Sequence, residues 1–345
     1  MNIKRYSSID QLRFIAALSV AISHFMISNN GYDLNLEIIS SISVEVFFII
    51  SGFVLAPQII KILENNSIKN YRIFLIRRWY RTIPLYVLSL ILTSIILNKF
   101  FTIDFLKYLL FLQNLIFIWL ENDYFSISWS LAVEEWFYIL FPLFLIFFFK
   151  FKKTIEKKTI INASILFILL IFLIRLFFAS ENNWGSDVRR IVLYRLDSIV
   201  YGFILFFFKD KFKPVFLYKI ILIILFLIFL LLIFNILYMN ASKDYNFYKV
   251  SFHFIVAIWG SILVIIFFIF DEKYISKNMI RFNMFLGKIS YSIYLFHLLI
   301  IFIISTISAS LLVKIIIYLI LQLAISILLY YYFEEPILKA RPHFN

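Results

Sequence analysis

The sequence predicts an all-α, polytopic membrane protein, and its composition, the length of its apolar segments and the placement of its positive charges each support this. Of 345 residues, 63% are hydrophobic and only 15% are charged, with a mean hydropathy of +0.95. Soluble domains average about 45–50% apolar and about 25% charged residues. A compact soluble fold of this length has too little interior to bury so much apolar surface.

Apolar segments close to the roughly 20 residues that a membrane-crossing helix needs recur along the chain. Eleven qualify or nearly do: 9–27, 42–62, 82–98, 103–120, 129–149, 159–179, 191–208, 217–239, 250–270, 286–307 and 311–333. Lys and Arg concentrate in cytoplasmic loops, so the basic loops 61–81 and 150–158 should lie on one side. Three segments separate these two loops, and an odd number of crossings cannot connect them. One of the three is therefore expected not to cross.

Segment 103–120 is the one that we expect not to cross, because polar residues interrupt and flank it, among them Asp104 and Lys107. We predict that it is re-entrant or lies in the outer interface. About ten spans then remain, both termini face the cytoplasm, and most of the 33 Lys and Arg residues fall on the cytoplasmic side. The net charge of +13 is thus explained by topology, and nucleic-acid binding is excluded. The N-terminal segment is predicted to be an uncleaved first span.

The residue counts exclude several kinds of site. Without Cys there are no disulfides, thiolate metal sites or Cys nucleophiles, and the scattered Gly residues form no phosphate-binding loop. The four His residues include no i, i+4 pair, so a helix-borne zinc site is not expected. His253 lies near a segment end and His343 in the tail, so neither is a strong functional candidate. We expect no metal and no permanently bound cofactor.

Ionisable residues within spans cost roughly 2.5–3.5 kcal/mol each on insertion scales, so each is a functional candidate. Arg13 and His24, eleven residues apart, fall within about 20° on one helix face and about 16 Å apart along the axis. Glu45 in the next span could pair with either residue and offset the cost of burial. The structural alternative is a snorkelling Arg and an interhelical His hydrogen bond. For Ser51-Gly52, close helix packing is the simpler interpretation.

Two further groups stand at span ends. Arg78 and Arg81, at i, i+3, share a helix face suited to bidentate phosphate binding, although a positive-inside anchor explains them equally well. The carboxylates of Glu134 and Glu135 enter an apolar span together, with Tyr138 one turn after Glu134. Both carboxylates cannot easily occupy lipid.

A polar stripe in segment 286–307 contains Tyr294 and His297, and a structural hydrogen bond is its alternative explanation. Arg195 and Asp197 are expected to form a local polar network. Arg175, near a span end, is expected to snorkel.

The order of these motifs resembles the membrane acyltransferase family 3, bacterial integral-membrane O-acyltransferases that modify surface glycans. The matching motifs are Ile9–Ala16 with R-x10-H ending at His24, Glu45–Phe53, R-x-x-R at Arg78–Arg81, W-S-L-x-x-E at Trp129–Glu134, Tyr194–Asp197, Ser290–His297 and Tyr332–Pro336. The family often has Asp where this chain has Glu45. Seven motifs in order cover nearly the whole chain.

The resemblance implies ten spans, a cytoplasmic acyl-CoA donor, most often acetyl-CoA, and a hydroxyl of an extracytoplasmic glycan or lipid-linked saccharide as acceptor. It also implies a multi-pass protein of the bacterial cytoplasmic (inner) membrane. Some relatives carry an additional extracytoplasmic hydrolase-like domain. We expect residues 1–345 to form a single membrane domain without an appended soluble domain, and transfer to the acceptor to be direct.

We predict that His24 acts as general base with Arg13 and Glu134, and that Arg78 and Arg81 bind the CoA phosphates. Glu134, Glu45 or His297 could orient His24, and spacing does not decide among them. Further candidate site residues are Ser51, Trp129, Ser130, Tyr138, Arg195, Asp197, Tyr294 and Glu334. The alternative is a secondary transporter or proton-coupled permease, since intramembrane Arg, His and Glu also suit ion pathways. Against it, matching halves with broken helices are not evident.

Overall fold

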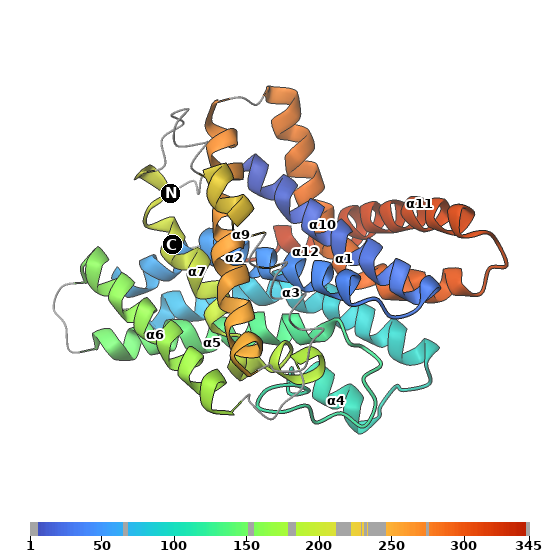
Figure 1. Cartoon of the computed structure of the whole chain (residues 1–345), viewed down its shortest axis with the longest axis horizontal. Coiled ribbons are helices and arrows are strands. Elements are labelled where there is room, and N and C mark those ends of the chain that lie inside the picture. Colours follow the sequence, from blue (N-terminus) through green and yellow to red (C-terminus); the bar gives the residue numbers. More distant parts are fainter. Residues whose placement is uncertain are drawn as a thin grey trace.

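The computed structural model describes residues 6–64, 68–150, 155–178, 184–211, 222–228, 246–273 and 276–342, with residues 230 and 233. These residues form helices and no strand, which confirms the all-α class (Figure 1). The long helices are α1 (Ser7–Asn30), α2 (Leu34–Glu64), α3 (Ile68–Ile96), α5 (Ser128–Phe149), α6 (Lys157–Phe178), α9 (Asn246–Lys273), α10 (Lys277–Ser305) and α11 (Leu311–Leu329). The short elements are α4 (Ile103–Leu109), η1 (Trp184–Val188), η2 (Val192–Tyr194), α7 (Asp197–Phe206), η3 (Lys209–Lys211), η4 (Tyr330–Glu334) and α12 (Glu335–Lys339).

Eight helices within the described ranges are long and apolar enough to cross a bilayer, so the chain is a multi-pass membrane protein. They are α1, α2, α3, α5, α6, α9, α10 and the continuous run from α11 to α12, and they match eight of the ten predicted spans. Most of a ninth, 217–239, lies outside the described residues. The exact count of ten is therefore not confirmed, and the orientation of the termini stays a prediction.

Segment 191–208 corrects the prediction of a full helical span. Its helix, α7, has only ten residues and is about 15 Å long, half of a hydrocarbon core about 30 Å thick. The residues before α7 form short turns instead of a continuous helix. These turns bring Arg195 and the first residue of α7, Asp197, into buried ion pairs with other helices.

Segment 103–120 does not form a spanning helix, as predicted. It contains the seven-residue α4, followed by irregular chain up to α5. Its polar residues serve the fold: Gln113 Nε2 donates to the carbonyl of Ser128 at 3.3 Å, and Asn114 Nδ2 donates to that of Trp129 at 3.2 Å. The segment thus fixes the start of α5. Its depth in the bilayer stays a prediction.

The bundle is organised around two helices. In their most apolar 18-residue stretches, 72% of α2 and 67% of α10 is buried, against 17% of the run from α11 to α12. Figure 1 accordingly shows α11 projecting from the edge of the bundle. The most extensive helix pairings are α1 with α10 and α2 with α7. The pairing of α1 with α10 brings together two His residues far apart in the sequence.

Helices α2 and α7 cross at a reciprocal pair of glycines. A Cβ on Gly52 would lie 1.8 Å from the carbonyl oxygen of Ile199, and a Cβ on Gly202 would lie 1.8 Å from that of Ile49. Only glycine lets these backbones approach so closely. This confirms the packing interpretation for Gly52, whereas Ser51 donates a hydrogen bond to Glu134.

Candidate active site

His24 and His297 form a hydrogen-bonded pair between α1 and α10. Nδ1 of His24 lies 2.8 Å from Nε2 of His297, and the rings are stacked with centroids 5.0 Å apart. On the other side of its ring, Nδ1 of His297 lies 2.6 Å from the carbonyl oxygen of Tyr294. His297 is fully buried. Of the three partners that the sequence allowed for His24, the structure brings His297 into contact with it.

The backbone carbonyl determines the protonation pattern of two neutral rings. A carbonyl can only accept, so Nδ1 of His297 carries a hydrogen and its Nε2 is an acceptor. Nδ1 of His24 must then donate to that Nε2, which leaves Nε2 of His24 unprotonated. The unprotonated Nε2 of His24 therefore points away from His297 and can act as a base.

The carboxylate of Glu134 connects α2 and α5 and makes no contact with the His pair in the described structure. Ser51 Oγ donates to Glu134 Oε1 at 2.8 Å, and the Tyr138 hydroxyl donates to Oε2 at 2.9 Å. The neighbouring Glu135 points to α3 and accepts from Thr82 Oγ1 at 2.5 Å. Two adjacent carboxylates thus enter the apolar span because each has a hydroxyl donor on a different helix.

Tyr294 also joins α10 to the start of α5. Its hydroxyl lies 2.6 Å from Ser130 Oγ and donates to the carbonyl of Ile127 at 3.2 Å. One residue therefore provides the carbonyl that orients His297 and a hydroxyl that fixes the W-S-L-x-x-E motif beside it. This explains two of the candidate residues, Tyr294 and Ser130, as parts of one arrangement.

A buried network of charges ties α2, α6, α7 and α9 together, and it corrects three predictions. Glu45 pairs with Arg195, not with Arg13 or His24. Arg195 also contacts His253, which is buried, so the interpretation of His253 as peripheral is wrong.

Arg175 does not snorkel. It is fully buried and ion-paired with Asp197. A cation inside a dry bundle needs a nearby anion, and α7 supplies it. Arg195 and Asp197 thus belong to one polar network, as predicted, but its partners come from distant helices.

The sequence motifs did not include Arg189 and Arg190, two arginines within electrostatic range of His24. Both interact electrostatically with His24 and with the Tyr294 hydroxyl. Positive residues are scarce in the outer loops of the predicted topology, so two consecutive arginines there were the available signal.

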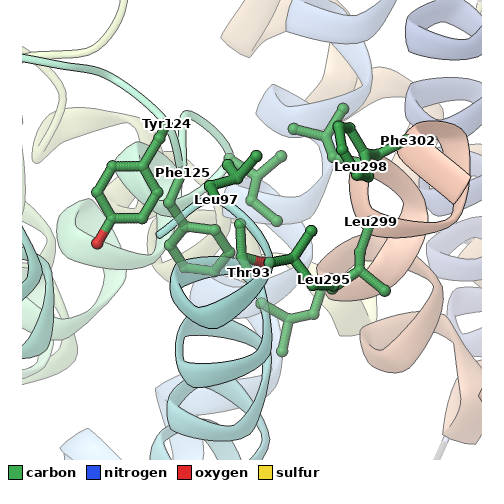
Figure 2. A pocket seen from close by; sticks show the side chains of 10 residues that line it. Thr93, Leu97, Tyr124, Phe125, Leu295, Leu298, Leu299 and Phe302 are labelled. Carbon is green, nitrogen blue, oxygen red and sulfur yellow. The ribbon is translucent and has the colours of Figure 1, made fainter. Parts of the chain in front are cut away.

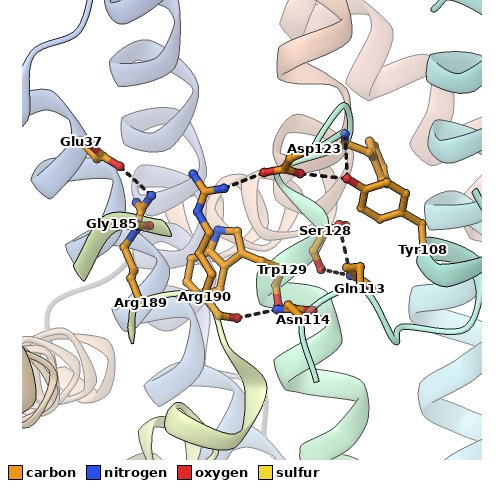
Figure 3. A network of polar contacts seen from close by, with 11 residues as sticks. Glu37, Tyr108, Gln113, Asn114, Asp123, Ser128, Trp129, Gly185, Arg189 and Arg190 are labelled. Carbon is orange, nitrogen blue, oxygen red and sulfur yellow. Dashed lines mark hydrogen bonds and ion pairs between the residues drawn. The ribbon is translucent and has the colours of Figure 1, made fainter. Parts of the chain in front are cut away.

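Carboxylates from opposite sides hold these arginines (Figure 3). Arg189 Nη2 donates to Glu37 Oε1 at 2.7 Å, and Arg190 Nη1 donates to Asp123 Oδ2 at 2.7 Å. Asp123 also accepts from the Tyr108 hydroxyl at 2.8 Å. Burial lowers the pKa of Arg189 to about 10, although the Glu37 carboxylate favours its charged form.

The predicted cofactor-binding arginines have different surroundings, although Arg78 and Arg81 remain within electrostatic range of each other. Arg78 is buried, and its Nη2 donates to Gln58 Oε1 at 3.2 Å. Arg81 lines a groove between α3 and α12. Glu334, in the same groove, accepts a hydrogen bond from Ser292.

Two candidates remain: Arg13 lies in the first half of α1, and Trp129 is the second residue of α5. Arg13 is ion-paired with Asp10 at 3.5 Å, away from the His pair. The guanidinium carbons of Arg189 and Arg195 each lie 5.9 Å from the centre of the Trp129 ring. His343 lies outside the described residues.

An apolar pocket between α3, the chain just before α5 and α10 lies near the site but is not part of it (Figure 2). It is lined by residues that include Leu295 and Leu299. Each is two positions from His297, and at about 100° per residue both point about 160° away from that ring. The pocket is therefore on the other face of α10.

Comparison with known proteins agrees with the motifs. The model of a family described as an acyltransferase domain matches residues 6–331. A Listeria monocytogenes protein named peptidoglycan O-acetyltransferase OatA is 30% identical over 184 residues, which are 47% of this chain and 28% of that protein. A Staphylococcus aureus protein provisionally named an O-acetyltransferase is 27% identical over 314 residues, 84% of this chain and 49% of that protein.

The chain thus spans about half the length, or less, of these two relatives. No solved structure shows a significant match. The family match covers nearly the whole chain, including the helices that bring His24 and His297 together. The protein belongs to this acyltransferase family, the membrane acyltransferase family 3 that its motifs resemble.

Proposed function

We propose that the protein transfers an acyl group, in the simplest case acetyl, from a cytoplasmic acyl-CoA to a hydroxyl of an extracytoplasmic glycan. Family membership and the relatives named as O-acetyltransferases support acyl transfer. The acceptor class is a surface polysaccharide or a lipid-linked saccharide, and the compartment is the bacterial cytoplasmic membrane. The predicted topology supports a donor and an acceptor on opposite sides.

The observation that carries this proposal is the chain from the Tyr294 carbonyl through His297 to His24. It leaves Nε2 of His24 as an oriented base. This nitrogen removes the proton of the acceptor hydroxyl as its oxygen attacks the thioester carbonyl carbon. The tetrahedral intermediate then collapses, the carbon–sulfur bond breaks, and the departing thiolate receives the proton from His24.

The residues around the His pair provide the charge for this reaction. Negative charge develops on the thioester oxygen, and the guanidinium groups of Arg189 and Arg190 provide a positive field beside His24. Their carboxylate partners Glu37 and Asp123 keep both arginines in place. We assign the acceptor to this end of the bundle.

The donor would approach from the end that contains Arg78 and Arg81. The polar residues Ser51 and Tyr138 are both hydrogen-bonded to Glu134 within the spans. Arg13, about 16 Å from His24 along α1, lies on the same side as the donor arginines in the predicted topology. We assign these residues to donor passage and positioning.

The direct test uses the purified protein in lipid nanodiscs, acetyl-CoA labelled in the acetyl group and a panel of glycan acceptors. The expected result is label in the glycan with stoichiometric release of free CoA thiol. His24→Ala should reduce the rate by about 10²–10⁴-fold. Wild-type rates in His24→Ala would refute the catalytic assignment. Substrate flux without thioester consumption would instead establish a permease.

A further inference from the structure

We infer that Arg77, Arg81 and Arg341 together form a binding site for the phosphate groups of an organic ligand. Arg78, the buried member of the R-x-x-R motif, instead donates a hydrogen bond to Gln58. The inference rests on the proposed function where the ligand is the donor thioester, whose nucleotide end carries phosphates. Anionic phospholipid headgroups present the same chemistry.

The C-terminal segment reaches these arginines because α12 packs against α3. The two helices form the groove that contains Arg81. Beyond α12, Arg77 Nη1 donates to the carbonyl of Pro342 at 2.5 Å, which fixes the segment after α12 beside α3. Arg341 directly precedes this carbonyl. A residue 264 positions from Arg77 is thereby placed next to it.

The guanidinium group of Arg341 lies close enough to those of Arg77 and Arg81 to be repelled by both. Arg341 interacts electrostatically with Arg77 and Arg81, and burial together with these two neighbours lowers its pKa. Nearby carboxylates have other hydrogen-bond donors: Glu334, which faces Arg81, accepts from Ser292, and Glu135 accepts from Thr82.

An anion with several oxygens would convert this repulsion into attraction. Guanidinium groups bind phosphate with two parallel hydrogen bonds, and several of them suit a diphosphate. The site lies at the end of the bundle that the topology assigns to the cytoplasm, where the basic loop 61–81 is found. A nucleotide-bearing thioester would enter at this end.

The experiment compares Arg341→Gln with Lys339→Gln in nanodiscs of phosphatidylcholine. Lys339 is an exposed neighbour whose ammonium group pairs with Glu335 at 3.5 Å, so its replacement removes the same charge outside the cluster. Arg341→Gln should raise the KM for acetyl-CoA about three- to tenfold with kcat unchanged, since one charge-assisted contact to a half-buried group is lost. Lys339→Gln should leave both constants unchanged.

Direct binding separates this site from the reaction. The affinities of adenosine 3′,5′-bisphosphate and inorganic pyrophosphate are measured by calorimetry, which needs no turnover. If Arg341→Gln lowers these affinities and Lys339→Gln does not, the result supports the site and a nucleotide ligand. This holds even if the wild type transfers no acetyl group.

A second set of nanodiscs contains phosphatidylglycerol. If Arg341→Gln weakens only the retention of this lipid, the phosphate site stands and its ligand is a headgroup. If Arg341→Gln and Lys339→Gln behave alike with every probe, the inference is overturned.

Discussion

The backbone carbonyl of Tyr294 lies 2.6 Å from Nδ1 of His297, one helical turn away on α10. This contact decides which nitrogen of His297 carries a hydrogen and, through it, which nitrogen of His24 is free. A main-chain oxygen is well suited to this role because it cannot donate a proton or rotate away.

His297→Ala should lower kcat roughly 10²-fold with little change in KM, because His24 loses the acceptor that fixes its tautomer. His297→Gln should retain more activity, since its amide oxygen can accept the hydrogen of His24 Nδ1. Steady-state kinetics on both variants, with thermal unfolding to verify folding, measure this. Equal rates in the two variants would mean that His297 fills space and does not orient His24.

Gly52→Ala should destabilise the protein by about 3 kcal/mol, at the upper end of typical overpacking costs, because the new methyl group would collide with a backbone carbonyl of α7. Gly185→Ala is the matched control. The nearest atom to its Cβ, an oxygen of Glu37, would lie at an ordinary 3.7 Å. Unfolding in a graded denaturant compares the two. A similar loss in both variants would contradict the tight crossing.

Glu45→Gln should cost about 3–5 kcal/mol of stability, since it leaves the fully buried Arg195 without its anion. The control is Glu335→Gln, which removes the anion of the exposed pair with Lys339 and should cost less than about 1 kcal/mol. The same unfolding assay measures both. If Glu45→Gln is as stable as Glu335→Gln, the buried pair does not hold α2 and α7 together.

Arg190→Gln should reduce kcat about tenfold, because the positive field beside His24 weakens where negative charge develops. Arg190→Lys keeps the charge and should retain most of the activity. Initial rates at saturating donor and acceptor measure the effect. Full activity in Arg190→Gln would mean that this arginine has only a structural role, through its ion pair with Asp123.

Most of the fold class could be predicted from the sequence. Apolar runs of about 20 residues and the sided distribution of Lys and Arg identify spans without reference to packing. The distribution of Lys and Arg also indicated that 103–120 is not a spanning helix, and the seven-residue α4 confirms this. The same reasoning failed for 191–208, because an apolar run cannot show that Arg195 and Asp197, near its beginning, form ion pairs with other helices.

The candidate site was predictable in part. Polar residues in apolar spans pointed to His24, Glu134 and His297, which lie inside the bundle. The pattern did not single out the partnership of His24 with His297. It also suggested the wrong partners for Glu45, whose ion pair is with Arg195, 150 positions away.

The sequence by itself determined that this protein is a helical membrane protein with ionisable groups in its spans, since hydropathy and charge act locally along the chain. The tertiary structure alone decided which of these groups meet. Partners such as Arg77 and Pro342, or His24 and His297, are separated by more than 260 residues. Their contact depends on how far each helix is rotated and where it crosses its neighbour, which close approaches such as that of Gly52 determine.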